Sequence, residues 1–240
     1  MLLLLAFVVL AVSVVHSEDS ACSPERADSC SAGIYYSSLE DNTFLPKSPE
    51  QLEEFCKRID SAQGCLMKEA EGCPEKPKSF LLAVGDGYKV AFQDICNPSM
   101  VERRASYLHH AQCLHNNYGK TCMLQYLQQL DLVLLSNSTT KMAIACCNMQ
   151  YYSLCTRASV TKACGEDAAD LQMELANGMA QAPVLRVCGT FIPGSEHCRN
   201  SPYIPVEEGA AHPMGTMLSR KLKILLSQEA AHAADHSTYY

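Results

Sequence analysis

The stretch SPEQLEEFCKRIDSAQGCLMKEAEGCP, residues 48–74, carries the pattern that decides the fold. Its apolar residues recur every three or four positions from Leu52 to Leu66, which predicts a helix with one buried face. Ser48 followed by Pro49 is typical of a helix start, because Ser can cap the first turn and Pro suits the first helical position. The cysteines on or beside this face are Cys56, Cys65 and Cys73.

The spacing of these cysteines belongs to a pattern that occurs twice. The first set is Cys22, Cys30, Cys56, Cys65, Cys73 and Cys96. The second set is Cys113, Cys122, Cys146, Cys155, Cys164 and Cys188. Adding 91 to each number of the first set gives a position within one residue of a member of the second set. We therefore predict two repeats of one helical module, each stapled by disulfides.

Two further cysteines lie outside the repeated pattern. Only one of the adjacent residues Cys146 and Cys147 fits the spacing, and Cys198 follows the second set. Fourteen cysteines without a C-x-x-C pair predict seven disulfides rather than zinc sites. We expect the extra member of the adjacent pair to bond Cys198. Within each set six cysteines allow fifteen pairings, and the spacing leaves the choice open.

Residues 1–17 have the character of a secretory signal peptide. Their apolar run ends in Val15-His16-Ser17 and is followed by acidic and polar residues. Small residues at such a boundary suit a signal peptidase, and the run is too short to favour a membrane span. No later stretch approaches the roughly 18 uncharged apolar residues of a membrane helix. We therefore expect a secreted, extracellular protein with no membrane span.

The cysteine sets divide the chain into four expected parts. These are the signal peptide at 1–17, a first cysteine-rich helical repeat at 18–98, a second at 99–198 and a C-terminal tail at 199–240. Helical periodicity with almost no two-residue alternation predicts an all-α fold without strands. Beyond the opening stretch, we expect helices over residues 80–95, 101–116, 121–135, 141–163 and 166–187. Gly85 and Gly87 predict a bend in the first of these, and Pro183 a kink or break in the last.

The tail combines an extended segment with an amphipathic one. Three prolines among small and polar residues predict a partly extended start. From Met217 to Leu226 apolar residues then recur at helical spacing beside basic residues. This predicts a short helix folded onto the core, with a partner-binding or membrane-surface role as the alternative. Residues 230–240 look like a flexible end.

Charge and motif content exclude several classes of function. The formal net charge of −7 argues against a nucleic-acid partner. No nucleophile, general base and oxyanion-binding group can be assembled from the motifs, so we predict no enzymatic activity, and no cofactor or metal. His232 and His236 have a metal-like spacing of four, but their alanine-rich surroundings favour a solvated end of the chain.

One glycosylation signal is present. Asn137-Ser138-Thr139 is an acceptor sequence in a polar break between two expected helices. A loop of this kind leaves the asparagine accessible to the glycosylation machinery. We therefore predict an N-linked glycan at Asn137, which makes the protein an extracellular glycoprotein.

Part of the chain resembles a known group of proteins. The segments that carry the resemblance are Phe55-Cys56 to Cys65-Leu66, Cys146-Cys147 to Cys155 and Cys164-Gly165-Glu166-Asp167-Ala168-Ala169. Through these segments, residues 22–190 resemble a loose group of secreted, helical, cysteine-rich invertebrate proteins of the arthropod type, mostly uncharacterised. The resemblance implies a helical extracellular glycoprotein and supplies no catalytic residue.

These observations leave three roles open. The first is a non-catalytic binding or structural role, with an unknown protein or a small hydrophobic ligand as the partner. A second is a carrier of small hydrophobic molecules, because helices stapled at their edges can enclose an apolar cavity that methionines and leucines would line. A third is a venom or salivary effector that acts on a host protein. A copurifying lipid would favour the carrier, and gland-restricted expression would favour the effector.

Overall fold

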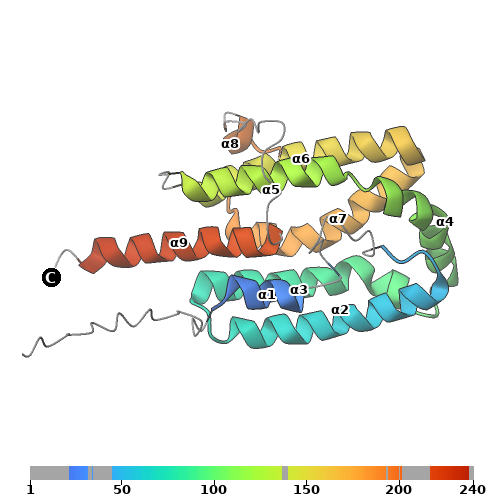
Figure 1. Ribbon diagram of the computed structural model, residues 1–240, viewed down its shortest axis with the longest axis horizontal. Coiled ribbons are helices and arrows are strands. Elements are labelled where there is room, and N and C mark those ends of the chain that lie inside the picture. The colour runs from blue at the N-terminus through green and yellow to red at the C-terminus, as the bar shows by residue number, and fades with distance from the viewer. Residues whose placement is uncertain are drawn as a thin grey trace, which may run out of the picture.

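The computed structural model describes residues 22–31, 34, 45–136, 140–192, 194–199, 201 and 217–237, with Lys120 and residues 232–237 described for their backbone alone. The described residues are mainly helical and contain no strand, which confirms the predicted all-α class (Figure 1). Their helices are α1 (Pro24–Cys30), α2 (Pro49–Ala70), α3 (Glu75–Cys96), α4 (Val101–Asn117), α5 (Lys120–Leu135), α6 (Lys141–Cys164), α7 (Glu166–Val187), α8 (Glu196–Arg199) and α9 (Met217–Ser237). The predicted signal peptide and Asn137 lie outside the described residues.

Helix α2 begins as its sequence predicts. The Ser48 hydroxyl accepts a hydrogen bond from the Gln51 N–H at 3.3 Å, and Pro49 is the first helical residue. The Gln51 side chain accepts one from the Lys47 N–H at 2.9 Å, so the reciprocal bond closes one residue earlier than in a standard capping box. The buried face contains Leu52, Phe55, Ile59, Ala62, Leu66 and Ala70.

The bend predicted at Gly85 and Gly87 is wrong, because α3 runs through both glycines. The reason for Gly87 lies in another helix. A Cβ atom placed on Gly87 would lie 2.4 Å from the carbonyl oxygen of Met179 in α7. Gly178 of α7 packs against α3 in the same way, since a Cβ atom placed on it would lie 2.9 Å from the Cα of Ala91. Because the two glycines have no side chain, the backbones of α3 and α7 can touch. This close packing offsets the low helix propensity of glycine.

Of the kink or break predicted at Pro183, the break is wrong, because α7 continues through this residue to Val187. Proline has no N–H, so the carbonyl four residues earlier, that of Met179, loses its helical donor. This is the same carbonyl that Gly87 packs against. The oxygen freed by Pro183 is thus covered by the backbone of α3, where a weak Cα–H contact can replace part of the lost bond.

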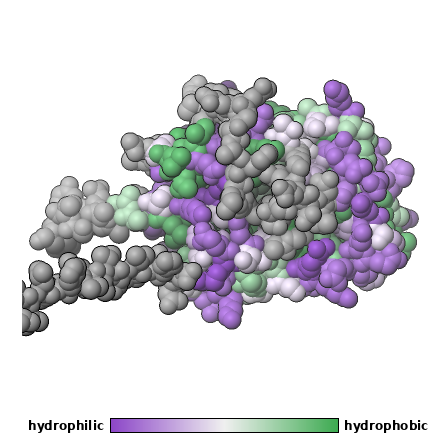
Figure 2. Space-filling model, in the orientation of Figure 1, coloured by the Kyte–Doolittle hydropathy of each residue, from purple (hydrophilic) through white to green (hydrophobic). Residues whose placement is uncertain are grey.

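Two helical hairpins form the centre of the molecule. Figure 1 shows α2 and α3 paired below and α6 and α7 above, with α3 and α7 meeting between them. Helix α4 crosses one end, where Figure 2 shows a largely hydrophilic surface. Helix α9 packs against α1, α3, α5 and α6 through Leu218, Leu222, Ile224 and Leu225. It continues to Ser237, so its helical part reaches beyond residue 230, where we expected a flexible end.

All fourteen cysteines form disulfides, as predicted. The pairs of the first set are Cys22–Cys73, Cys30–Cys65 and Cys56–Cys96. Those of the second set are Cys113–Cys164, Cys122–Cys155 and Cys146–Cys188. Both sets therefore pair first with fifth, second with fourth and third with sixth. The remaining pair, Cys147–Cys198, is the bond expected to fix the chain after the second set.

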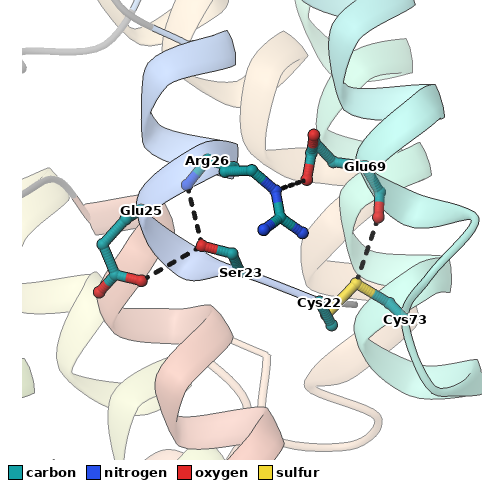
Figure 3. Close-up of a disulfide and its surroundings, with 6 residues drawn as sticks. All are labelled: Cys22, Ser23, Glu25, Arg26, Glu69 and Cys73. Atoms are coloured by element: carbon teal, nitrogen blue, oxygen red, sulfur yellow. Dashed lines mark hydrogen bonds and ion pairs between the residues drawn. A yellow bond between two sulfur atoms is a disulfide. The ribbon is translucent and has the colours of Figure 1, made fainter. Parts of the chain in front are cut away.

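The disulfide between Cys22 and Cys73 shows how α1 is attached to the first hairpin (Figure 3). It joins the residue before the cap of α1 to the turn after α2. Beside it, the Arg26 guanidinium lies 2.7 Å from a Glu69 carboxylate oxygen, which adds a second link between the helices. The Ser23 hydroxyl caps α1 by accepting a hydrogen bond from the Arg26 N–H at 3.2 Å.

Candidate ligand-binding cavity

A cavity of about 610 Å³, partly open to the surface, lies among α3, α6, α7 and α9. Helices α4 and α5, residue Leu45, and Cys188 and Ile192 after α7 complete its wall within the described part of the chain. Its volume falls in the range of about 300–1,000 Å³ typical of small-molecule sites. Protein interiors are otherwise packed to the density of organic crystals, so a space of this size needs an explanation.

The walls of the cavity are predominantly apolar and easily deformed. Three aromatic residues line it: Phe80, Phe92 and Tyr152. Five methionines contribute from four helices: Met123, Met142, Met149, Met179 and Met217. Methionine has three rotatable bonds and a polarizable sulfur, and therefore adapts to irregular ligands. The arrangement is suited to an apolar molecule whose shape the wall can follow.

The disulfide between Cys146 and Cys188 forms part of the wall. It joins the interior of α6 to the residue after α7, the two helices that supply much of the lining. A neighbouring disulfide, Cys147–Cys198, holds the chain beyond α7 against α6. These bonds restrict separation of the walls, so the cavity belongs to a covalently braced part of the fold.

Lys221 is the one charged residue among the described residues that line the cavity. It projects from α9 and is partly buried. Its ammonium nitrogen lies 3.4 Å from the Met149 sulfur and 5.6 Å from the centre of the Tyr126 ring. Removal of the ammonium from water lowers the pKa of Lys221 to about 8. The group therefore remains mainly protonated at neutral pH on an apolar wall.

The other polar lining is uncharged. It comes from Ser153 of α6 and from Gln172, Asn177 and Gln181 of α7. The Ser153 hydroxyl donates to the Met149 carbonyl at 3.0 Å, and the Gln172 amide donates to the Tyr118 carbonyl at 3.4 Å. Both are partly engaged in holding the wall together. The cavity thus offers a ligand one cation and a small number of amide groups.

The cavity borders α3 of the first hairpin as well as α6 and α7 of the second, and the residues next to corresponding cysteines differ between the hairpins. Phe55 precedes Cys56 in the first set, and its ring packs edge-on against Phe92 at 4.9 Å between centroids. The residue that precedes Cys146 is Ala145. Pro183 and Val184 stand in α7 near the position that Phe92 occupies in α3, and both line the cavity. The second hairpin therefore has no aromatic ring at these two positions, although Tyr152 elsewhere in α6 lines the cavity.

The residues singled out in the sequence contribute unequally to this site. Cys146 and Cys188 line the cavity, whereas the other cysteines brace the fold elsewhere. His232 and His236 have side chains outside the described set, as does the Asn137 acceptor. Within the described residues, no three His, Cys, Asp or Glu side chains form a group that could hold a metal ion.

Sequence reasoning missed the special position of Lys221. The sequence pattern places Lys221 only among the basic residues of the amphipathic segment from Met217 to Leu226. A signal was present, because Lys221 lies beside Leu222 and three residues after Leu218, on the stripe itself rather than opposite it. Its isolation depends on Asp131 and Glu25, which pair with the neighbouring cations and lie far from them in the sequence.

Comparison with known proteins gives no relative from which a function can be transferred. No protein-family model, curated protein or solved structure matches the chain.

None of the helices in the described ranges has the length and apolar character needed to cross a bilayer.

Proposed function

We propose that the protein is a secreted carrier that binds a small apolar ligand in the cavity among α3, α6, α7 and α9. The observation that carries the proposal is the 610 Å³ space with its methionine-rich wall. A storage or transport protein needs a preformed, mostly apolar enclosure with few polar groups. The predicted absence of catalytic machinery agrees with binding as the whole activity.

The disulfides support a role outside the cell. Seven bonds persist in an oxidising environment and limit opening of the helices when the protein is diluted or heated. The proposal includes a cleaved signal peptide at residues 1–17 and a glycan at Asn137. It retains the resemblance to secreted cysteine-rich invertebrate proteins as the expected family setting.

The proposal also treats the two cysteine sets as copies of one module. Equal pairing order supports this, and so does burial: several buried positions of α2 have buried counterparts 90 residues later in α6. These are Leu52 with Met142, Phe55 with Ala145, Ile59 with Met149, Leu66 with Thr156, and Ala70 with Val160. The facing glycines Gly87 and Gly178 are 91 residues apart, the offset of the cysteines. In this view one copy retained a filled core and the other opened a binding space.

Filling the cavity tests the carrier function. Ala180→Phe places a ring at a partly buried position of the wall. Ala158→Phe adds the same ring at an exposed position of α6 that does not line the cavity and is the matched control. With a neutral fluorescent probe such as N-phenyl-1-naphthylamine, we expect saturable binding that A180F weakens at least tenfold and A158F leaves unchanged. Thermal unfolding verifies that both variants fold.

Two outcomes would contradict the carrier function. The first is the absence of saturable probe binding to the unsubstituted protein, accompanied by a native mass spectrum of the source protein without a small-molecule adduct. The second is equal probe affinity in folded A180F and A158F. Either result would favour a protein-binding, structural or effector role over the carrier function.

A further inference from the structure

Lys221 differs from the two cations that flank it on α9. The Arg220 guanidinium forms two bonds to the Asp131 carboxylate, at 2.7 and 3.0 Å. The Lys223 ammonium lies 2.9 Å from a Glu25 carboxylate oxygen. No carboxylate of the described residues forms an ion pair with Lys221, although it is the one of the three that lines the cavity.

The contacts of the Lys221 ammonium leave it short of strong acceptors. An ammonium has three donors, whereas a thioether sulfur is a weak acceptor and an aromatic ring offers its face alone. The two contacts are the Met149 sulfur at 3.4 Å and the Tyr126 ring at 5.6 Å. The Tyr126 hydroxyl is itself committed, because it donates to the Ala145 carbonyl at 3.1 Å. A partly buried cation held in this way is favourably placed to pair with an anion that enters the cavity.

We propose that the ligand of this cavity is an aliphatic monocarboxylic acid, whose carboxylate binds the Lys221 ammonium while its apolar chain occupies the methionine-lined space. This inference rests on the proposed carrier function and adds the chemical class of the ligand.

The site favours one negative charge over two. A phosphate group is usually held by several donors, such as an arginine fork, a second cation or a helix N-terminus. The described lining offers one lysine and uncharged amides. Arg220, the nearest guanidinium in sequence, is occupied by Asp131. A single carboxylate therefore matches the available charge, whereas a phosphorylated lipid would leave charge uncompensated in an apolar enclosure.

The decisive comparison uses two ligands of equal chain length, laurate and 1-dodecanol, and three substitutions. Lys221→Met removes the charge and keeps the length of the side chain, and Lys221→Arg restores the charge. Lys223→Met is the matched control, because this lysine lies on the same helix, is exposed and does not line the cavity. Affinities are measured by displacement of N-phenyl-1-naphthylamine and by calorimetry at pH 7.

We expect K221M to weaken laurate binding about ten- to a hundredfold, the range that a charge-assisted hydrogen bond supplies. Dodecanol binding should change less than threefold in K221M. K223M should bind both ligands like the unsubstituted protein, and K221R should recover most of the affinity for laurate. The ratio of laurate to dodecanol affinity isolates the head-group interaction from the burial of the chain.

The inference and the carrier function fail in different ways. If K221M and the unsubstituted protein bind laurate equally, or if dodecanol loses as much affinity as laurate, the carboxylate assignment is overturned while the apolar cavity stands. If K223M loses laurate as K221M does, a general surface charge rather than Lys221 attracts the acid. If neither ligand displaces the probe from the unsubstituted protein, and the probe itself does not bind saturably, the carrier function fails as well.

Discussion

The hairpin of α2 and α3 and the hairpin of α6 and α7 share a disulfide frame but differ in what fills them. In the first, Phe55 and Phe92 pack ring against ring beside the Cys56–Cys96 bond. In the second, Ala145 precedes Cys146, and the Cys146–Cys188 bond borders a cavity. The comparison shows that the same order of disulfides can hold a ring-packed core in one hairpin and border a cavity in the other. A binding space can therefore arise on one side while the other side preserves the fold.

The largest expected effect comes from removing one disulfide at the same place in each hairpin. The double variants are C56A/C96A and C146A/C188A, whose bonds span 40 and 42 residues. Nearly equal loops predict nearly equal losses of unfolding free energy, about 4 kcal/mol each by loop-closure entropy. Only C146A/C188A should also weaken probe binding, because its bond lines the cavity. Denaturant unfolding and probe titration measure the two effects. Equal loss of binding in both double variants would contradict a specific role of the Cys146–Cys188 bond in the cavity wall.

A smaller effect is expected at the crossing of α3 and α7, where both hairpins meet. Gly87→Ala directs a methyl group at the Met179 carbonyl oxygen, and Gly178→Ala directs one at Ala91. Because backbone atoms cannot move aside cheaply, each change should cost about 2–4 kcal/mol of unfolding free energy. Gly64→Ala is the control, since a Cβ on this α2 glycine has no neighbour within 4 Å. We expect that change to stabilise the protein by about 0.5–1 kcal/mol.

Urea denaturation of the three glycine variants separates packing from helix propensity. Propensity alone predicts that all three alanines stabilise the protein. If G87A and G178A prove as stable as G64A, the close approach of the two hairpins is wrong. If only one of them is destabilised, the contact between the two hairpins is less symmetric than the 91-residue offset of Gly87 and Gly178 indicates.

The sequence predicted the parts of the fold that depend on local patterns. The apolar stripe from Leu52 to Leu66 and the Ser48 cap gave α2 correctly, because both signals lie within the helix that they describe. The Cys147–Cys198 bond was also predictable, because pairing within the two sets of six leaves one of the adjacent cysteines and Cys198. Local signals failed at Gly87 and Pro183, where the physical cause is the neighbouring helix, nearly a hundred residues away in the chain.

The cavity was less predictable than the helices. Methionine and leucine content allowed a cavity in principle, but core packing accounts for the same residues. What distinguishes the two cases is an unfilled volume, and this depends on how the side chains of α3, α6, α7 and α9 pack against one another. Likewise, Lys221 differs from Arg220 and Lys223 only because Asp131 and Glu25 reach its neighbours and not it. Such contrasts become visible when distant segments are placed together.

The smallest expected effect concerns the stability that Lys221 costs the unliganded protein. Burial lowers its pKa to about 8 from an ordinary value of 10.5, so between these values the unfolded chain binds more protons than the folded one. The full cost of burying the charge is therefore present below pH 8 and disappears as the pH rises toward 10.5. K221M should be more stable than the unsubstituted protein by about 1–2 kcal/mol at pH 7, and the difference should vanish near pH 10.5.

The charged and titratable groups around Lys221 justify assigning this pH dependence to one side chain. Arg220 and Lys223 are paired with carboxylates, and the Tyr126 hydroxyl is held by a backbone carbonyl. These groups are common to both proteins, so their titration cancels in the difference of unfolding free energies.

Saturating laurate should reverse the order of stability of the two proteins, because it stabilises the unsubstituted protein by supplying the missing anion and stabilises K221M much less. A cation that is costly in the empty cavity and favourable in the filled one is what distinguishes a binding residue from a structural one. A K221M variant that is less stable than the unsubstituted protein at pH 7 without ligand would show that Lys221 serves the fold instead.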